Sequence, residues 1–206
     1  MKKVKNIFVS ILVLLVAVLS FGTVLITHSH ESVVNAGSGV YVEDGGEFNA
    51  TGGVIKDNAK GAITINGGTH TIENVVFDGN LETAINVRGG VLNLVNCRIT
   101  NNLSSSNGGA INVASGATLN LKGTTTITGN SAINGGAIYA AAGSTVNISG
   151  KLNIQNNTAT SYGGAIFAAG AVNIAANFTG SIKGNTANIG ADGYMNAGTL
   201  DVNSNA

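Results

Sequence analysis

The chain of 206 residues carries 10 basic and 10 acidic side chains, so its overall charge does not favour binding to nucleic acid. Glycine is abundant at 30 residues and proline is absent; without proline and without a three-residue glycine period, a collagen-like chain is excluded. Regular short runs of Ile, Val and Leu argue against disorder, and the length allows one ordinary domain behind a targeting segment.

The N-terminal segment is typical of an exported protein. Three lysines within residues 1–6 precede an apolar run of 20 residues, Ile7 to Ile26. A cleaved signal has an apolar core of about 7–15 residues, whereas a membrane-spanning helix needs about 20. We therefore expect residues 1–27 to be a signal peptide or a signal-anchor helix that contacts the membrane if it is retained. Residues 28–38 are expected to be a linker, and the rest of the chain to be secreted or displayed at the cell surface.

From residue 39 onward the chain repeats three short motifs. The first is Ile/Phe-x-x-Asn, and its asparagines are Asn58, Asn80, Asn102, Asn130, Asn157 and Asn185. Successive asparagines lie 22, 22, 28, 27 and 28 residues apart. The second motif, Ala-Ile, follows each of the first five asparagines, and the third is an apolar–polar–apolar triplet such as Leu92-Asn93-Leu94.

Three short strands per repeat predict an all-β fold, a right-handed single-stranded parallel β-helix with about six full coils and a partial seventh over residues 39–206. The Ile residues of the Ala-Ile motifs are predicted to form an inner column, because alternate side chains of a strand share one face. The six motif asparagines are predicted to form a structural ladder, each amide bonding to those above and below it. An uncapped end of such a helix exposes a pairing edge, so we expect end-to-end self-association or a further C-terminal region.

The repeat motifs resemble those of a known family. Gly108-Gly109-Ala110-Ile111, the same tetrapeptide at 135–138 and 163–166, and Phe77-Asp78-Gly79-Asn80 are similar to the GGAI and FxxN repeats of chlamydial polymorphic membrane proteins. More broadly, the chain resembles bacterial adhesin-like proteins with a pectin-lyase-like β-helix. The resemblance implies a surface protein that adheres to or binds a glycan or a protein, without catalysis. Five of the six Phe positions of the family motif are Ile here.

Two features of the later repeats predict a binding surface. The gap from motif Asn to the next Ile grows from five residues to eight or nine, which places extra turns at 103–107, 131–134, 158–162 and, by continuation, 186–190. In a solenoid such insertions line up on one side, often the binding side. The outward row beside the Ile column ends in Tyr139, Phe167 and Met195, next to Tyr162. We expect these four residues to form an exposed apolar strip that serves as a stacking platform for the partner, unless the long turns cover it.

Two other functions stay open. The same fold hosts polysaccharide lyases and glycosidases, whose chemistry needs two positioned carboxylates, or an acidic calcium site with a base. The best acidic pair, Asp57 and Asp78, has Lys56 nearby, but the two carboxylates have different offsets from their motif asparagines. We therefore expect them to point to opposite sides and to be solvated turn residues. Ice binding would need a threonine column across coils, whereas Thr124-Thr125-Thr126 lies in a single coil.

No motif predicts a cofactor, a resident metal or a catalytic residue. The closest approach to a metal-binding pattern is His28-Ser29-His30-Glu31, which we interpret as a short stretch beside the membrane. Cys97 is the single cysteine, so it cannot form an internal disulfide. We expect it to be a buried, inert thiol.

Overall fold

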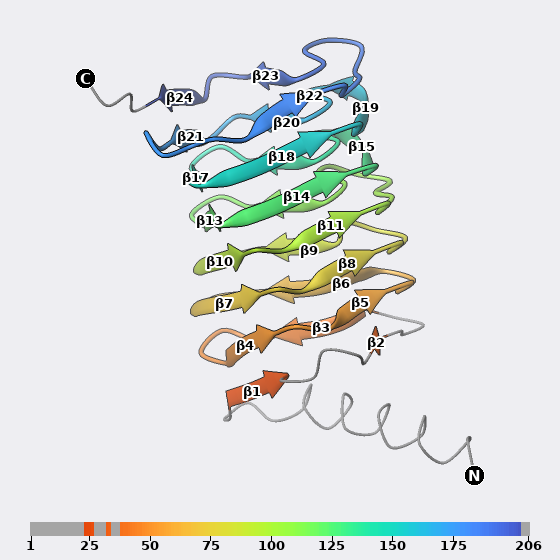
Figure 1. The fold of residues 1–206 in the computed structure, drawn as a ribbon, viewed down its shortest axis with the longest axis vertical. Helices are drawn as coiled ribbons and strands as arrows, with labels where there is room; N and C mark the ends of the chain where they lie inside the picture. The colour runs from red at the N-terminus through yellow and green to blue at the C-terminus, as the bar shows by residue number, and fades with distance from the viewer. Residues whose placement is uncertain (1–22, 27–31, 34–37, 203–206) are drawn as a thin grey trace.

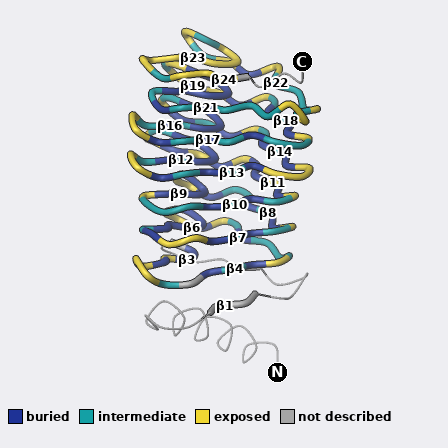
Figure 2. The backbone as a smooth tube through the Cα atoms, turned by 90° about the vertical axis from the view of Figure 1, so that its left-hand side faces the viewer, coloured by how far each residue is buried: buried dark blue, intermediate teal, exposed yellow. Residues whose placement is uncertain are grey.

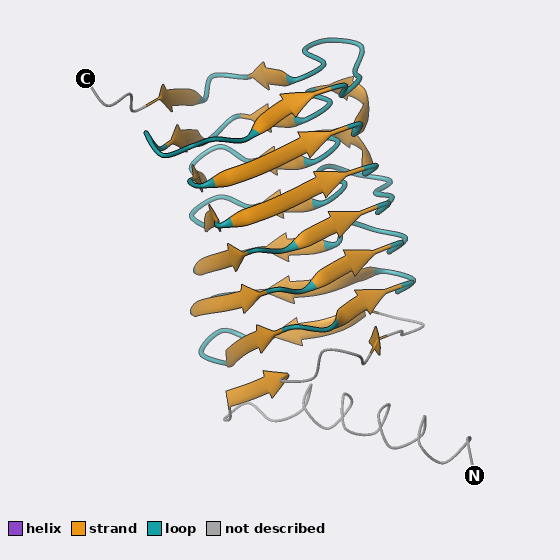
Figure 3. Cartoon of the chain, viewed as in Figure 1, coloured by secondary structure: helices purple, strands orange, loops and turns teal. Residues whose placement is uncertain are grey.

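The computed structural model describes residues 23–26, 32–33 and 38–202, and in this part of the chain every regular element is a β-strand (Figure 3). The strands run parallel and stack in about six turns along one axis (Figure 1). The predicted parallel β-helix is thereby confirmed. Among the described residues, no helix has the length and hydrophobicity needed to cross a membrane.

Three sheets form the sides of the solenoid, and each takes one strand from every coil. The first sheet contains β1 (Thr23–Ile26), β4 (Glu47–Thr51), β7 (Thr69–Glu73), β10 (Val91–Val95), β13 (Thr118–Lys122), β17 (Thr145–Ile148), β21 (Ala171–Ile174) and β24 (Thr199–Val202). The second contains β2 (Ser32–Val33), β5 (Val54–Lys56), β8 (Val76–Asp78), β11 (Arg98–Thr100), β14 (Thr124–Thr128), β18 (Lys151–Gln155) and β22 (Ser181–Lys183). The third contains β3 (Ser38–Val42), β6 (Gly61–Ile65), β9 (Ile85–Val87), β12 (Ile111–Val113), β16 (Ile138–Ala140), β20 (Ile166–Ala168) and β23 (Gly193–Met195).

The strands reach further toward the N-terminus than the sequence motifs indicated. Thr23–Ile26, which we expected at the end of an apolar helix, form β1 and pair in parallel with β4. Ser32–Val33, expected in a linker, form β2 and pair with β5. The predicted signal or anchor helix otherwise falls on residues 1–22, which lie outside the described part of the chain.

The interior is a set of apolar columns that follow from the alternation of side chains. In the third sheet Ile63, Ile85, Ile111, Ile138 and Ile166 are in register from coil to coil. The first four of these are at most 1% exposed, and burying each such side chain contributes about 2 kcal/mol. Buried residues therefore follow the inner side of the strands from β5 to β21, while exposure is concentrated in the turns and in the coil that holds β23 (Figure 2).

A fourth, short sheet forms where the coils lengthen. The extra residues that we expected as turns become β15 (Ser131–Asn134) and β19 (Thr158–Tyr162), which pair in parallel. Single bridges extend the pattern to the flanking coils, from Leu103 to Ser131 and from Tyr162 to Ile189. Insertions of similar length in neighbouring coils bring their backbones about 4.8 Å apart, so their peptide groups pair with each other, with one register shift between Ala132 and Asn134. Ala132 and Ala159 fill the inner side of this sheet and are 2% and 3% exposed.

Candidate functional site

The asparagines of the Ile/Phe-x-x-Asn motif lie inside the solenoid in a single row. Asn58, Asn80, Asn102, Asn130, Asn157 and Asn185 are all at most 5% exposed. Each Nδ2 donates to Oδ1 of the asparagine in the next coil, over distances from 2.7 Å to 3.0 Å. The same Oδ1 also accepts the backbone N–H of the preceding asparagine, as Asn102 does from Asn80 at 3.0 Å. At the C-terminal end of the row, Asn185 donates instead to Oδ1 of Asp192 at 2.8 Å. The row therefore satisfies polar groups at the corner of every coil and presents little surface to a ligand.

The residue before each of these asparagines has a left-handed backbone. Its φ is 54° at Asp57, 64° at Gly79, 56° at Asn101, 70° at Gly129, 55° at Asn156 and 68° at Gly184. Asp or Asn thus alternates with Gly from coil to coil. A Cβ on Gly79 would lie 2.8 Å from Oδ1 of Asp57, and a Cβ on Gly129 would lie 2.7 Å from Oδ1 of Asn101. The side chain of one coil occupies the space above the glycine of the next, which explains the alternation.

Four aromatic side chains gather on the outside of the later coils. Tyr139 and Phe167 are in register in the third sheet, and Phe167 is in register with Tyr194. The Tyr139 and Phe167 ring centroids are 4.9 Å apart with an interplanar angle of 13°, and those of Phe167 and Tyr194 are 5.5 Å apart. Tyr162, at the end of β19, places its ring 4.7 Å from Tyr194 and 6.5 Å from Phe167. We call Tyr139, Tyr162, Phe167 and Tyr194 the aromatic cluster.

The aromatic cluster differs from the predicted strip at two positions. Phe167 is 6% exposed, because its neighbours in the cluster cover it, so it does not offer an open ring face to a ligand. Met195 was expected in the row but is in register with Ala168, on the other face of the strand, so this part of the prediction is wrong. Tyr194 takes its place. A spacing in the sequence could have identified Tyr194. Tyr139, Phe167 and Tyr194 each lie four residues after a glycine, namely Gly135, Gly163 and Gly190, and the structure shows that all three glycines have a left-handed backbone.

Exposed apolar side chains continue from the aromatic cluster along the fourth sheet. Ile133 is 42% exposed, Tyr162 37% and Ile189 52%, and they lie on three successive coils. Asn134 is in register with Tyr162, and Tyr162 is bridged to Ile189. We call the segments 103–107, 131–134, 158–162 and 186–190 the ridge.

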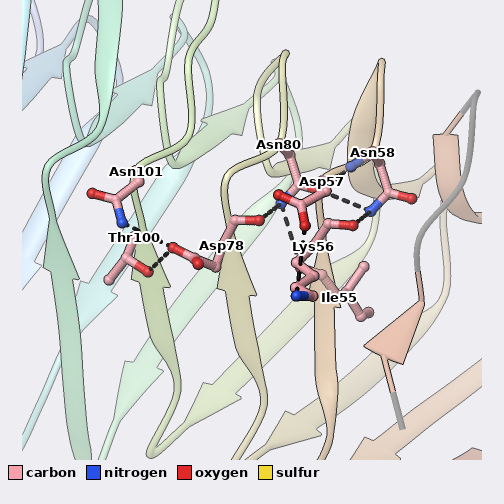
Figure 4. Close-up of polar contacts among 8 residues, drawn as sticks. All are labelled: Ile55, Lys56, Asp57, Asn58, Asp78, Asn80, Thr100 and Asn101. Carbon is pink, nitrogen blue, oxygen red and sulfur yellow. Dashed lines mark hydrogen bonds and ion pairs between the residues drawn. The ribbon is translucent and has the colours of Figure 1, made fainter.

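Asp57 and Asp78, the acidic pair near the N-terminal coils, both form contacts with neighbouring side chains (Figure 4). Oδ1 of Asp78 accepts hydrogen bonds from Oγ1 of Thr100 at 2.6 Å and from Nδ2 of Asn101 at 3.0 Å. Asp57 forms an ion pair with Lys56, whose Nζ lies 3.6 Å from Oδ2. In the strand register Asp78 is opposite Lys56, one position away from Asp57. The two carboxylates thus occupy different rows, but Asp78 is a half-buried residue at the end of β8 and not the solvated turn residue that the sequence predicted.

The outer face of the first sheet carries a regular row of asparagines. Nδ2 of Asn120, Asn147 and Asn173 donates to Oδ1 of the asparagine in the preceding coil, at 3.0 Å, 2.8 Å and 2.8 Å. The neighbouring row reads Thr69, Val91, Thr118, Thr145, Ala171 and Thr199. Val91 and Ala171 interrupt this row, so within it only Thr118 and Thr145 are neighbours and no continuous threonine column crosses the coils.

Two buried polar side chains belong to the core. Cys97 is 1% exposed, and burial raises the pKa of its thiol from 9.0 to about 11. His70, which no sequence motif singled out, replaces an apolar residue on the inner face of the first sheet, in register with Leu92. Its Nδ1 accepts the N–H of Phe48 at 3.2 Å, and its Nε2 donates to the carbonyl of Gly67 at 2.6 Å. His28 and His30 lie outside the described residues, within which no group of three or more His, Cys, Asp or Glu side chains is placed to hold a metal ion.

Fold and repeats together define a parallel β-solenoid repeat protein with an uncharged ridge on one side. Residues 96–114, 124–141 and 151–169 match the Chlamydia polymorphic membrane protein (Chlamydia_PMP) repeat. The three matched segments begin at or near the second sheet, continue through the motif Asn and the ridge, and end in or beside the third sheet, one in each of three successive coils. No curated protein and no solved structure matches the chain significantly.

Proposed function

We propose that the protein is a surface-displayed β-solenoid of the adhesin type, which binds a glycan or a protein partner outside the cell through the aromatic cluster. The matched repeats carry the name of a membrane-protein family, and the apolar N-terminal stretch is consistent with export. If this stretch is retained, it would attach the solenoid to the membrane. If it is cleaved, the solenoid would be released from the membrane.

The gathering of four aromatic rings on the outer surface is the observation that carries this proposal. Tyr and Trp provide large contact areas with few rotatable bonds, which is why they dominate the energetics of binding surfaces. The stacked arrangement fixes the rings before a partner arrives, so little side-chain entropy is lost on binding. Because the face of Phe167 is covered, contact is expected through the ring edges and hydroxyls of Tyr139, Tyr162 and Tyr194.

Binding of the full chain to host cells and to a glycan array tests the proposal. Tyr139→Ala and Tyr194→Ala should each weaken binding about tenfold, the loss expected for an aromatic contact near the centre of an interface. Tyr41→Ala is the matched control, because Tyr41 occupies the same outward row of the third sheet at the opposite end and is 41% exposed. Equal binding by all three variants would rule out the aromatic cluster as the binding site. Cleaved or unsaturated sugar products, detected by mass spectrometry, would replace the adhesin proposal with an enzyme.

A further inference from the structure

Charge is distributed unevenly along the solenoid, although the overall charge of the chain is zero. Residues 38–82 contain seven acidic and two basic side chains, whereas residues 83–191 contain five basic side chains and no acidic one. Charges at a protein surface are screened over about 8 Å at physiological ionic strength. A ligand at the later coils therefore senses mainly their positive side chains, and a surface of one sign attracts ligands of the opposite sign.

Four of the five basic side chains lie on one side of these coils, at the second sheet (Figure 1). Each of four successive coils contributes one of them, namely Arg98 at the start of β11, Lys122 at the corner that leads into β14, Lys151 at the start of β18 and Lys183 at the end of β22. All four are exposed. Successive coils are about 4.8 Å apart, so these side chains cover about 14 Å along the axis. We call Arg98, Lys122, Lys151 and Lys183 the basic face.

The cations of the basic face are not neutralised by the protein. In the described part of the chain, none of the four forms an ion pair or a side-chain hydrogen bond. Asp57, on the same side of the solenoid, is paired with Lys56, and Asp78 accepts two hydrogen bonds from side chains of the next coil. Glu73 lies two coils before Lys122, about 9.6 Å away along the axis. An anionic ligand that bridges the four cations therefore gains a favourable contact at each of them without displacing an internal partner.

Uncharged polar side chains lie between the cations. The outward positions of β14, β18 and β22 hold Thr126, Thr128, Asn153, Gln155 and Ser181. Among the described residues these side chains form no hydrogen bond, so their hydroxyl and amide groups are available to the hydroxyl groups of a sugar. The strands β11, β14, β18 and β22 carry no aromatic side chain and no exposed large apolar one. The stacking contacts that hold single-stranded nucleic acid and the apolar contacts that insert into a membrane surface are thus both missing from this side.

We propose that the basic face binds a linear polyanionic glycan, whose sulfate or carboxylate groups contact the four cations while its hydroxyl groups contact the polar side chains between them. The choice of a glycan rests on the proposed display outside the cell. The site itself does not, because the aromatic cluster belongs to the third sheet and the ridge.

A second copy of the chain fits the basic face less well. The acidic side chains of the early coils do not form one matching face. Glu43 and Glu47 lie before and at the start of β4 in the first sheet, whereas Asp57 follows β5 in the second. A polymer with an anionic group on every sugar or every second sugar instead presents a continuous series of partners to cations spaced over four coils.

Binding of the full chain to dextran sulfate, alginate and neutral dextran, measured by titration calorimetry, tests the proposal. Saturable binding of at least one charged glycan is expected, and the tighter of the two identifies the anionic group. An exposed ion pair strengthens binding by up to about fivefold, so the double variant Lys122→Gln/Lys151→Gln should bind about tenfold more weakly. Its affinity should also depend less steeply on salt, because fewer counterions are released on binding. Equal binding of dextran and the charged glycans, or no binding of either charged glycan, would overturn the proposal.

Lys60→Gln/Arg88→Gln is the matched control. It removes the same charge from two exposed residues that lie outside the basic face, and it should bind the charged glycan as the native chain does. Equal weakening by the two double variants would show attraction by charge in general and would overturn the site. Tighter binding to double-stranded DNA or to phosphatidylserine vesicles would overturn the choice of a glycan, and so would a dimer in sedimentation velocity that Lys122→Gln/Lys151→Gln abolishes. Tyr139→Ala should keep its affinity for the charged glycan, so failure of the aromatic cluster as a binding site can be distinguished from failure of the basic face.

Discussion

The buried asparagine row makes a quantitative prediction for Asn102→Ala. Oδ1 of Asn102 accepts two hydrogen bonds from Asn80, one from its backbone N–H at 3.0 Å and one from its side-chain Nδ2 at 2.7 Å. Nδ2 of Asn102 in turn donates to Oδ1 of Asn130 at 2.8 Å. All three asparagines are at most 1% exposed, so water cannot replace the lost acceptor without opening the corner. Each buried donor left without a partner costs about 1–3 kcal/mol. With two donors affected, we expect the free energy of unfolding to fall by about 3–5 kcal/mol.

Asn120→Ala is the matched control for Asn102→Ala. Asn120 also belongs to a row of hydrogen-bonded amides, donating to Asn93 at 3.0 Å and accepting from Asn147 at 2.8 Å, but this row is on the outer face of the first sheet and only half-buried. Water can reach its partners, so the loss should stay below about 1 kcal/mol. Urea denaturation of the full chain, followed by circular dichroism, measures both changes. Equal losses for the two variants would refute the argument that burial makes the inner row stabilising.

Four other variants test the turns and the core. Burial raises the pKa of the Cys97 thiol from 9.0 to about 11, so the thiol ionises at a lower pH in the unfolded chain than in the folded one. The contribution of the protonated thiol to the free energy of unfolding is therefore fully present below pH 9.0 and is lost as the pH rises to about 11. The loss should be on the order of 2 kcal/mol, and urea midpoints across this pH range should fall more for the native chain than for Cys97→Ala. Gly135→Ala should cost about 3 kcal/mol, since φ is 62° and a Cβ would lie 2.3 Å from the carbonyl oxygen of Ile138. Gly116→Ala, with φ of 79° but open space around it, should cost about 1 kcal/mol, and similar thermal stabilities for the two variants would contradict the steric argument. Asp192→Ala removes one of the two acceptors of Asn185, whose Nδ2 also donates to the carbonyl of Ile154, and should accelerate amide hydrogen exchange in the coil that holds β23, while exchange around β8 stays unchanged.

The sequence was sufficient for the coil architecture because the repeat imposes the same local requirements many times. Ile at alternate positions, a left-handed corner and a buried asparagine recur in each coil, and their joint recurrence is compatible with few folds. The third-sheet column of Ile63, Ile85 and Ile111 could therefore be placed residue by residue.

Features that depend on contacts between coils were harder to predict. β15 and β19 form because each supplies the other's hydrogen-bonding partner, and this pairing between coils is not visible in the residues of either coil alone. Tyr194 escaped prediction because Gly193 replaces the Ile that marks the register in the earlier coils. His70 escaped for a related reason, since a histidine in an apolar column is accepted only where a backbone donor and acceptor lie on either side of it.

The alternation at the left-handed corner limits how such a gene can change in length. Loss of one coil would bring Asn101 next to Asp57. The Cβ of Asn101 would then clash with the carboxylate of Asp57, which now packs over Gly79, and the Asp57 side chain would have to rotate away. Loss of two coils would restore a glycine at the contact. Recombination that adds or removes coils in pairs would therefore keep a glycine next to each of these Asp or Asn side chains.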